Sequence, residues 1–139
     1  MAYWRLFYHL VWATRSREPL IGEREETIIR RSFQTTLDSM RVIPHAIGMM
    51  PDHTHVVASI PPSVLVAEVV KRLKGASTHA VNHESGVPPE VPFAWQGGYG
   101  VLSFSERALP DVVAYVRNQR EHHAKATTWP GLERTDEDA

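Results

Sequence analysis

Residues 42–60 of the chain read VIPHAIGMMPDHTHVVASI, and this stretch decides the fold. Two runs of apolar and β-branched residues, 42–50 and 53–60, lie on either side of the dipeptide 51–52, Pro-Asp, which is typical of a tight turn. The pattern predicts two antiparallel strands joined as a β-hairpin. Because proline cannot donate a ladder hydrogen bond, Pro44 places the first of them at a strand start or on a sheet edge.

Two histidines stand one residue apart at the head of the second predicted strand. Alternate side chains of a strand point to the same face, so His53 and His55 are expected side by side, with Thr54 pointing the other way. Two imidazoles on one face can hold one metal ion when a third ligand comes from elsewhere. By spacing alone, the plainer interpretation of one solvated and one half-buried histidine is favoured.

The rest of the chain supplies elements on both sides of this hairpin. The pattern predicts strands at 3–14 and 93–104, and helices at 23–41, at 63–79 with Ser63 as N-cap, and at 110–125. The order β-α-β-β-α-β followed by a helix is the split βαβ pattern. We therefore expect an α+β, ferredoxin-like antiparallel sheet with helices on one face, plus a C-terminal helix that is free to cover the other face.

Composition limits the possible classes of protein. A chain of 139 residues with 42% hydrophobic residues predicts one domain, which we assign to residues 1–128. Residues 129–139 hold four acidic residues and one arginine, and we expect them to form an acidic, disordered tail. The absence of cysteine excludes disulfides and thiolate metal sites. With no apolar run of membrane-spanning length and no signal-peptide pattern, a cytoplasmic location is expected.

Basic residues gather at two places that suit contacts with a nucleic-acid backbone. The candidate DNA-binding residues are Arg15, Arg17, Lys71, Arg72, Lys74 and Ser77. A solvated loop after the first strand and a solvated cationic helix face are the plainer interpretations of the same residues. The net charge of −1 argues against tight non-specific binding of duplex DNA but leaves room for a local basic groove.

The final predicted helix carries a phenol and a carboxamide one turn apart. Tyr115 and Gln119 stand at positions i and i+4, which lie on one face of a helix. The side-chain oxygen of Gln119 can bind a metal ion, and Tyr115 belongs to the side chains that act as covalent nucleophiles. The phenol has an ordinary pKa of about 10, so attack requires help from a metal or a base. Taken singly, each residue is more typical of ordinary helix packing.

Four sequence blocks, taken together, resemble a known family. They are MPDHTH at 50–55, KGAS at 74–77, AWQGGYG at 94–100 and YVRNQREHH at 115–123, and the start YHLVWAT at 8–14 also fits. In this order and spacing, the chain resembles the single-tyrosine transposases of the HUH superfamily. These are the IS200-like enzymes of small insertion sequences, whose relatives include REP-associated tyrosine transposases. The resemblance covers roughly residues 3–125.

The resemblance implies a function and a set of site residues. It implies that His53, His55 and Gln119 hold Mg²⁺ or Mn²⁺, and that Tyr115 attacks the scissile phosphate of single-stranded DNA. The products would be a 5′-phosphotyrosine bond and a free 3′-hydroxyl, so that strands can be rejoined during DNA transposition. The resemblance also implies hairpin recognition at the ends of the element and a homodimer with a joined sheet. Whether the final helix completes the site of its own subunit or of its partner stays open.

One residue departs from the family pattern, and two other functions remain in view. The position between the histidines is usually bulky and hydrophobic, whereas here it is Thr54, for which we expect altered packing and intact metal ligation. The main alternative is a non-catalytic, ferredoxin-like module, a domesticated transposase that recognises DNA or RNA hairpins by base stacking. A metal-dependent hydrolase that uses His53 and His55 with an activated water is the other.

Overall fold

A four-stranded antiparallel sheet forms the centre of the computed structural model, which describes residues 2–84, 86, 89–125 and 127–135. The elements in chain order are β1 (Phe7–Ala13), η1 (Arg15–Arg17), α1 (Glu23–Ser39), β2 (Ile43–Met50), β3 (His53–Ser59), α2 (Val66–His83), β4 (Gly100–Phe104), η2 (Glu106–Ala108), α3 (Leu109–Arg117), α4 (Gln119–Ala124) and α5 (Pro130–Glu133). The strand order is β2-β3-β1-β4. This confirms the predicted α+β, ferredoxin-like fold.

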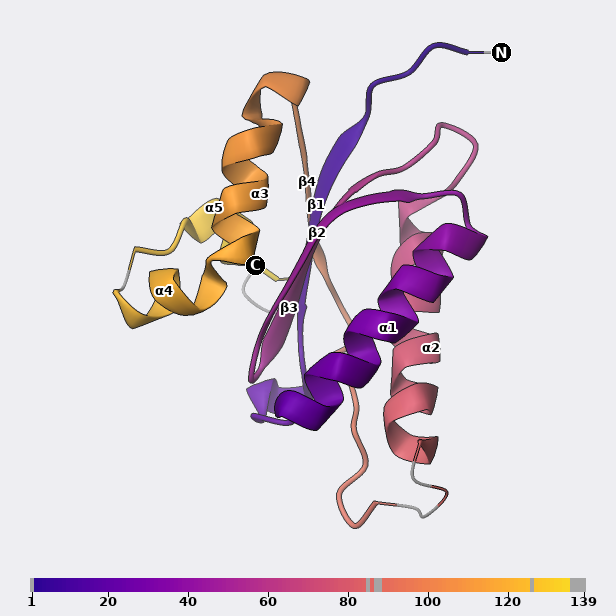
Figure 1. The fold of residues 1–139 in the computed structure, drawn as a ribbon, viewed down its shortest axis with the longest axis vertical. Helices are drawn as coiled ribbons and strands as arrows, with labels where there is room; N and C mark the ends of the chain where they lie inside the picture. Colours follow the sequence, from indigo (N-terminus) through magenta and orange to yellow (C-terminus); the bar gives the residue numbers. More distant parts are fainter. Residues whose placement is uncertain (1, 85, 87–88, 126, 136–139) are drawn as a thin grey trace.

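Helices cover both faces of the sheet. In Figure 1 the sheet is seen nearly edge-on, with α1 and α2 on one side and α3, α4 and α5 on the other. The α1/α2 side holds the larger apolar core, in which Leu10, Trp12 and Phe33 are fully buried. The α3 side holds a smaller core of buried residues, which are Ala46, Val57, Val112, Tyr115, Val116 and Leu132. The C-terminal helices therefore cover the face that the predicted sheet left open, and this second face carries the histidine pair.

The predicted hairpin is present. Strands β2 and β3 pair antiparallel, with Met50 opposite His53 at the turn, and every residue of β3 is buried. Strand β2 lies at the sheet edge, where the register shifts between Pro44 and Ala46, as expected for a proline that cannot donate to the ladder. Thr54 points away from the histidines, and its hydroxyl donates to the carbonyl of Gly48. Thr54 thus lies on the α1/α2 side of the sheet, next to Trp12, its partner on β1.

Several element boundaries differ from the predicted ones. Helix α2 begins at Val66, not after Ser63, because residues 61–64 form a turn closed by a hydrogen bond from Val64 N to Pro61 O. The strand predicted at 93–104 is reduced to β4. The segment before β4 is held by the ammonium group of Lys74, which donates to the carbonyls of Gln96 and Gly98. These carbonyls therefore bond to a side chain and not to a neighbouring strand.

The helix predicted at 110–125 is two helices. Helices α3 and α4 meet at Asn118, whose backbone torsions are not helical (φ −103°, ψ 27°). The break lies between Tyr115, on α3, and Gln119, the first residue of α4. It turns α4 relative to α3, so that His123 points toward the sheet near His53.

The C-terminal segment corrects the prediction of a disordered tail. Residues 129–135 are described, and they include α5, with Leu132 and Thr135 buried at 8% and 2% exposure. A Cβ atom on Gly100 would lie 2.0 Å from the carbonyl oxygen of Arg134, so the segment runs directly against β4. Residues 136–139, which carry the other three acids, lie outside the described residues. No helix in the described part of the chain is long and apolar enough to cross a membrane.

Candidate metal centre and nucleophile

The histidine pair lies on the face of the sheet covered by the C-terminal helices. His53 and His55 point the same way from β3, their ring centroids are 5.0 Å apart, and their exposures are 4% and 0%. Strand β1 fixes the pair by antiparallel pairing of Ala13 with His53 and of Val11 with His55. The alternation of the strand thus produces the side-by-side arrangement predicted from the sequence.

Each histidine of the pair has a fixed partner on its Nδ1 atom. Asp52 Oδ1 lies 2.7 Å from His53 Nδ1, and His9 Nε2 lies 2.8 Å from His55 Nδ1. A histidine that ligates a metal through Nε2 normally donates its Nδ1–H to such an acceptor, which fixes the tautomer and the ring orientation. Asp52 comes from the turn and His9 from β1, so both partners are built into the sheet.

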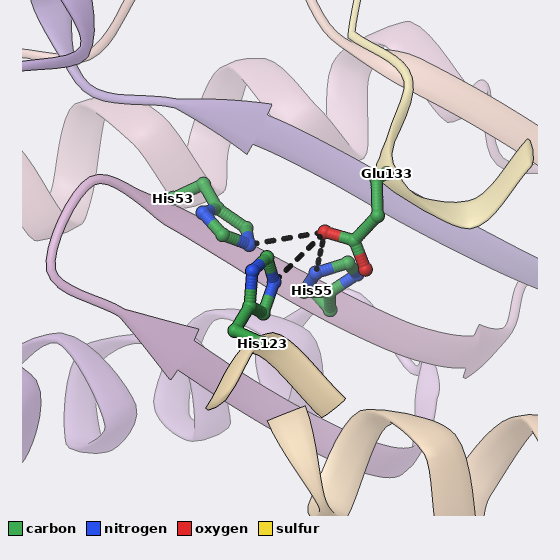
Figure 2. A group of neighbouring side chains, drawn as sticks. All are labelled: His53, His55, His123 and Glu133. Carbon is green, nitrogen blue, oxygen red and sulfur yellow. Dashed lines mark ion pairs between the residues drawn. The ribbon is translucent and has the colours of Figure 1, made fainter. Parts of the chain in front are cut away.

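Two residues from the C-terminal region complete the group (Figure 2). His123, from α4, and Glu133, at the end of α5, place their ligand atoms with those of His53 and His55, all within 4.8 Å of one another. Glu133 Oε1 lies 3.2 Å from the Nε2 atoms of His53 and His55 and 3.3 Å from that of His123. A carboxylate oxygen therefore faces three imidazole nitrogens, a donor set of the kind that binds a divalent ion.

The distances and orientations in this group suit a metal ion. A tetrahedral ion with bonds of about 2.0 Å has ligand atoms about 3.3 Å apart, close to the three distances observed from Glu133. The Nε2 atoms of His53 and His55 are buried and make no well-aligned hydrogen bond within the described residues, although Glu133 is near. Buried nitrogens without a hydrogen bond are available as ligand atoms. The residues present therefore fit a metal ion.

Tyr115 lies beside this group, on α3. Its hydroxyl donates to Glu133 Oε2, the second oxygen of the carboxylate, and accepts a 2.9 Å hydrogen bond from the backbone N–H of Trp129. Its ring lies between the rings of His122 and Trp129, with centroids 4.6 and 4.7 Å away. The Glu133 carboxylate therefore links the Tyr115 hydroxyl to the candidate metal ligands, with one oxygen on each side.

Gln119, the third ligand implied by the family resemblance, is at the edge of the group. It is 2% exposed, its Oε1 lies 3.1 Å from His123 Nε2, and its amide donates to the backbone carbonyl of Tyr115. His123 Nε2 thus faces both Gln119 and Glu133. The structure brings Gln119, Tyr115 and both histidines of the pair together in one chain, and a carboxylate stands among them that the sequence analysis did not assign to the site.

Burial and the carboxylate set the charges of the site. Burial opposes a charge on His53, but the contacts with Asp52 and Glu133 outweigh it and raise the pKa of this histidine to about 9. Burial lowers the pKa of His55. Burial also opposes a charge on Glu133, but its histidine contacts outweigh this effect and hold its pKa well below the usual range. The site is thus organised around an anionic Glu133 paired with a cationic His53.

The candidate nucleophile is neutral in this arrangement. Burial, followed by the hydrogen bond to Glu133, raises the pKa of Tyr115 to about 12. His9, on the far side of His55, has its pKa lowered to about 3 by burial and by the neighbouring imidazole. Both residues therefore carry no charge near neutral pH, and Tyr115 has to lose its proton in the course of any attack.

The predicted DNA-binding residues lie in three different environments: a shallow groove, the exposed surface and the buried core. Arg15 and Lys74 line one shallow groove next to Trp95, and Arg17 is exposed with Asp52 3.7 Å away. Lys71 and Arg72 are exposed on α2. Ser77 is fully buried; its hydroxyl donates to the carbonyl of Leu73 and accepts from the indole N–H of Trp95. Ser77 is placed for a structural role inside the core.

Two members of the site were missed at the level of sequence. His123 belongs to the block YVRNQREHH, but the predicted continuous helix gave no reason to bring it to the sheet. Glu133 was counted with the acidic tail. A cue was available in Trp129 and Leu132, two large apolar residues in a segment otherwise expected to be solvated. Apolar residues of this size favour a docked segment.

A ferredoxin-like sheet with a histidine pair that could hold a metal ion and an adjacent helical tyrosine is the arrangement expected of a single-tyrosine transposase. The family model described as "Transposase IS200 like" matches residues 2–119, most of the chain, and the protein belongs to that family. A curated relative is the ISDra2 transposase TnpA of Deinococcus radiodurans, 28% identical over 124 residues that span 85% of this chain and 86% of the relative.

Solved structures share the fold. One is the crystal structure of a protein from Deinococcus radiodurans R1 that is described as a candidate transposase. It matches this chain with a TM-score of 0.65 and 25% sequence identity, over 86% of this chain and 95% of the matched chain. A REP-associated tyrosine transposase bound to a REP hairpin has a TM-score of 0.66 and 14% identity, covering 88% of this chain and 74% of its own. The second likeness concerns the fold alone.

Proposed function

We propose that this transposase cleaves and rejoins single-stranded DNA with Tyr115 as the nucleophile. The supporting observation is that the Tyr115 hydroxyl lies one carboxylate away from the His53, His55 and His123 nitrogens. In the proposed step, the Tyr115 oxygen forms a bond to the scissile phosphorus and the bond to the 3′-oxygen breaks. The tyrosine loses its proton and the leaving oxygen gains one. The products are a 5′-phosphotyrosine and a free 3′-hydroxyl, and reversal of the step joins strands.

The proposed metal ligands are His53 and His55, with His123, Glu133 or Gln119 as further ligands. A divalent ion bound there supplies polarisation of a phosphate oxygen and neutralises charge that develops in the reaction. Of the two ions expected, Mg²⁺ and Mn²⁺, the imidazole nitrogens favour Mn²⁺, since Mg²⁺ strongly prefers oxygen ligands. His9 and Asp52 keep the histidine pair in the tautomer that presents Nε2 to the ion.

The proposed substrate is single-stranded DNA that carries hairpin ends. The groove lined by Arg15 and Lys74 places the exposed Arg15, and the Lys74 ammonium that also bonds the Gln96 and Gly98 carbonyls, near the indole of Trp95, which suits a phosphate backbone with an adjacent base. Arg17, Lys71 and Arg72 remain candidate phosphate contacts on the surface. A homodimer is also proposed, because β4 is an edge strand of the sheet whose residues Val101 and Leu102 are each 42% exposed.

A labelled single strand that contains the end of the element tests the proposed chemistry. Incubated with the protein and Mn²⁺, it should yield a covalent protein–DNA adduct that migrates slowly on a denaturing gel. Tyr115→Phe should abolish the adduct, because it removes the hydroxyl that lies against Glu133 beside the proposed metal ligands. Tyr3→Phe is the matched control, since Tyr3 is 90% exposed and precedes β1 in the chain.

Each alternative gives a different result in the same experiment. A metal-dependent hydrolase would produce cleaved DNA without an adduct and would tolerate Tyr115→Phe. A non-catalytic module would bind the hairpin without cleavage and without dependence on metal. An adduct that persists in Tyr115→Phe would show that another residue is the nucleophile. Calorimetry with Mn²⁺ on His55→Ala examines the metal centre separately, and an unchanged affinity would contradict it.

A further inference from the structure

The proposed nucleophile and its neighbours are closed off from solvent. The exposed fractions of Tyr115, His55 and Gln119 are 1%, 0% and 2%. A scissile phosphate on a DNA strand cannot reach an oxygen in such a position. Two hydrogen-bond partners of the Tyr115 hydroxyl, Glu133 Oε2 and the Trp129 N–H, belong to the C-terminal segment 129–135. This segment therefore covers the Tyr115 hydroxyl, while His122 of α4 stacks on the Tyr115 ring.

The two oxygens of Glu133 make different contacts. Oε1 faces the three imidazole nitrogens, and Oε2 accepts the hydrogen bond of the Tyr115 hydroxyl. A scissile phosphate in the proposed reaction must satisfy the same two requirements. It must place one anionic oxygen at the metal ligands and the rest of the group against the attacking phenol. The carboxylate is an anion with oxygens on one planar centre, so it can meet both requirements in place of the phosphate.

We propose that Glu133 occupies the binding position of the scissile phosphate and that segment 129–135 is a displaceable cover over the active site. This inference rests on the proposed function. DNA cleavage then requires the segment to leave, and the DNA phosphate takes the position that the Glu133 carboxylate occupies beside the histidines. The Glu133 carboxylate is an anion, as the DNA phosphate is, so the two groups compete for one position.

The contacts of the segment are suited to reversible docking. Trp129 stacks on the Tyr115 ring at 4.7 Å, and Leu132 is buried in the smaller core. The Arg134 carbonyl passes Gly100 so closely that a methyl group there would lie 2.0 Å from its oxygen. The helix in the segment, α5, has only four residues, too short to be stable alone. Docking therefore depends on a few contacts, and the loss of any one should favour the open state.

Two variants release the cover by independent routes. Glu133→Gln keeps the size of the side chain but removes the charge that faces the histidines. Gly100→Ala places a methyl group against the Arg134 carbonyl and leaves Tyr115 and the proposed ligands unchanged. The matched controls are Glu121→Gln, an exposed carboxylate paired with Lys125, and Gly97→Ala, which has open space around it.

The first measurement reports the cover without any need for catalysis. Tetranitromethane nitrates exposed tyrosines, and mass spectrometry of peptides gives the rate at Tyr115. We expect slow nitration in the native full-length chain and in both control variants, and faster nitration in Glu133→Gln and Gly100→Ala. Equal rates at Tyr115 in all of these proteins would overturn the proposal. If nitration is faster but no protein forms an adduct, the cover is confirmed and the proposed strand-transfer function fails.

The second measurement uses the single-stranded element end with Mn²⁺. If fewer than about a tenth of the native molecules are in the open state, the two variants that release the segment should bind this DNA more tightly than native. Both their DNA affinity and their rate of adduct formation should rise by about tenfold or more. Mn²⁺ affinity, measured by electron paramagnetic resonance, should fall in both Glu133→Gln and Gly100→Ala, because each variant takes the Glu133 carboxylate from the ligand group, and it should stay close to native in the two control variants. Loss of the adduct in Glu133→Gln with Mn²⁺ still bound would overturn the proposal, because Glu133 would then be required for the reaction.

Discussion

His9 and His55 are joined through their ring nitrogens, with His9 Nε2 2.8 Å from His55 Nδ1. Both rings are fully buried. A metal ion can bind His55 only through Nε2, so the Nδ1 atom must carry the proton and donate it to His9. The low pKa of His9, about 3, means that its ring is neutral, and the tautomer that carries the proton on Nδ1 leaves Nε2 to accept that bond. His9 is thus a permanently neutral acceptor that selects the tautomer of a metal ligand.

Replacement of His9 by phenylalanine should weaken metal binding. The ring shape is kept, but the acceptor for His55 Nδ1–H is lost. Loss of such a partner typically lowers metal affinity by about 10- to 100-fold. Calorimetry with Mn²⁺ should show a loss in this range. His9→Gln, whose amide oxygen can accept the same bond, should recover most of the affinity.

The same variant separates a positioning role from a purely structural one. His9 Nδ1 is buried and makes no hydrogen bond within the described residues, so removing it relieves the cost of an unpaired polar atom. The buried Nδ1–H of His55 loses its acceptor at the same time, so the two effects oppose each other. The melting temperature of the metal-free His9→Phe protein should therefore change little while metal affinity falls. A parallel drop in both quantities would mean that His9 acts through packing alone. His79→Phe, on the exposed surface of α2, provides the control.

Metal binding should release a proton from His53. Its pKa of about 9 in the metal-free protein means that it is protonated at pH 7, whereas ligation requires the neutral ring. Binding at pH 7 should therefore release about one proton, and Mn²⁺ affinity should increase up to about tenfold per pH unit until about pH 9. Calorimetry in buffers with different ionisation enthalpies measures the release. Asp52→Asn, which removes an adjacent negative charge, should reduce it; no dependence on the buffer would contradict the prediction.

The raised pKa also has a consequence for stability. The ordinary pKa of histidine is 6.5 and that of folded His53 is about 9, so the protonated form is favoured by folding. The stability gained this way is fully present below pH 6.5 and is lost as the pH rises to about 9. Urea unfolding of the metal-free protein should follow this trend. In Glu133→Gln the loss over this window should be smaller.

The sequence was sufficient for the hairpin and for the pairing of the histidines, because both depend on local patterns. A turn dipeptide between two apolar runs and the two-residue repeat of a strand fix where His53 and His55 point. The order of elements was likewise sufficient for the ferredoxin-like topology. Tyr115 and Gln119 could be named from the helical spacing and the family resemblance.

The remaining parts of the site depend on tertiary contacts that no local pattern encodes. His123 reaches the sheet because the chain breaks at Asn118, and a single break of this kind has no strong sequence signal. Glu133 reaches the histidines because Leu132 is buried and Gly100 permits a close approach across a distance of more than thirty residues in sequence. The negative charge of the C-terminal stretch predicted a solvated segment. In the structure one of its carboxylates, that of Glu133, instead contacts the imidazoles of the site.

Ser77 and Arg15 should behave oppositely when they are replaced. Ser77→Ala leaves the buried indole N–H of Trp95 without its acceptor, which should cost about 1–3 kcal/mol of stability. DNA affinity of the folded variant should be unchanged, since Ser77 is fully buried. Arg15→Ala should weaken DNA binding and reduce its dependence on salt, with little change in stability. Chemical unfolding and fluorescence anisotropy at two salt concentrations distinguish the two effects.

Gly48 sets the distance between the sheet and the helix that carries Tyr115. A Cβ atom at this position would lie 2.3 Å from the backbone carbonyl of Val116, an approach that only a shift of α3 can relieve. Overpacking of this kind costs about 1–3 kcal/mol. Gly48→Ala should therefore lower the melting temperature and, by moving Tyr115, reduce adduct formation even where the variant is folded. Gly75→Ala, in open space on α2, should be neutral or stabilising because alanine favours a helix. Equal stability of the two variants would contradict the tight contact between β2 and α3.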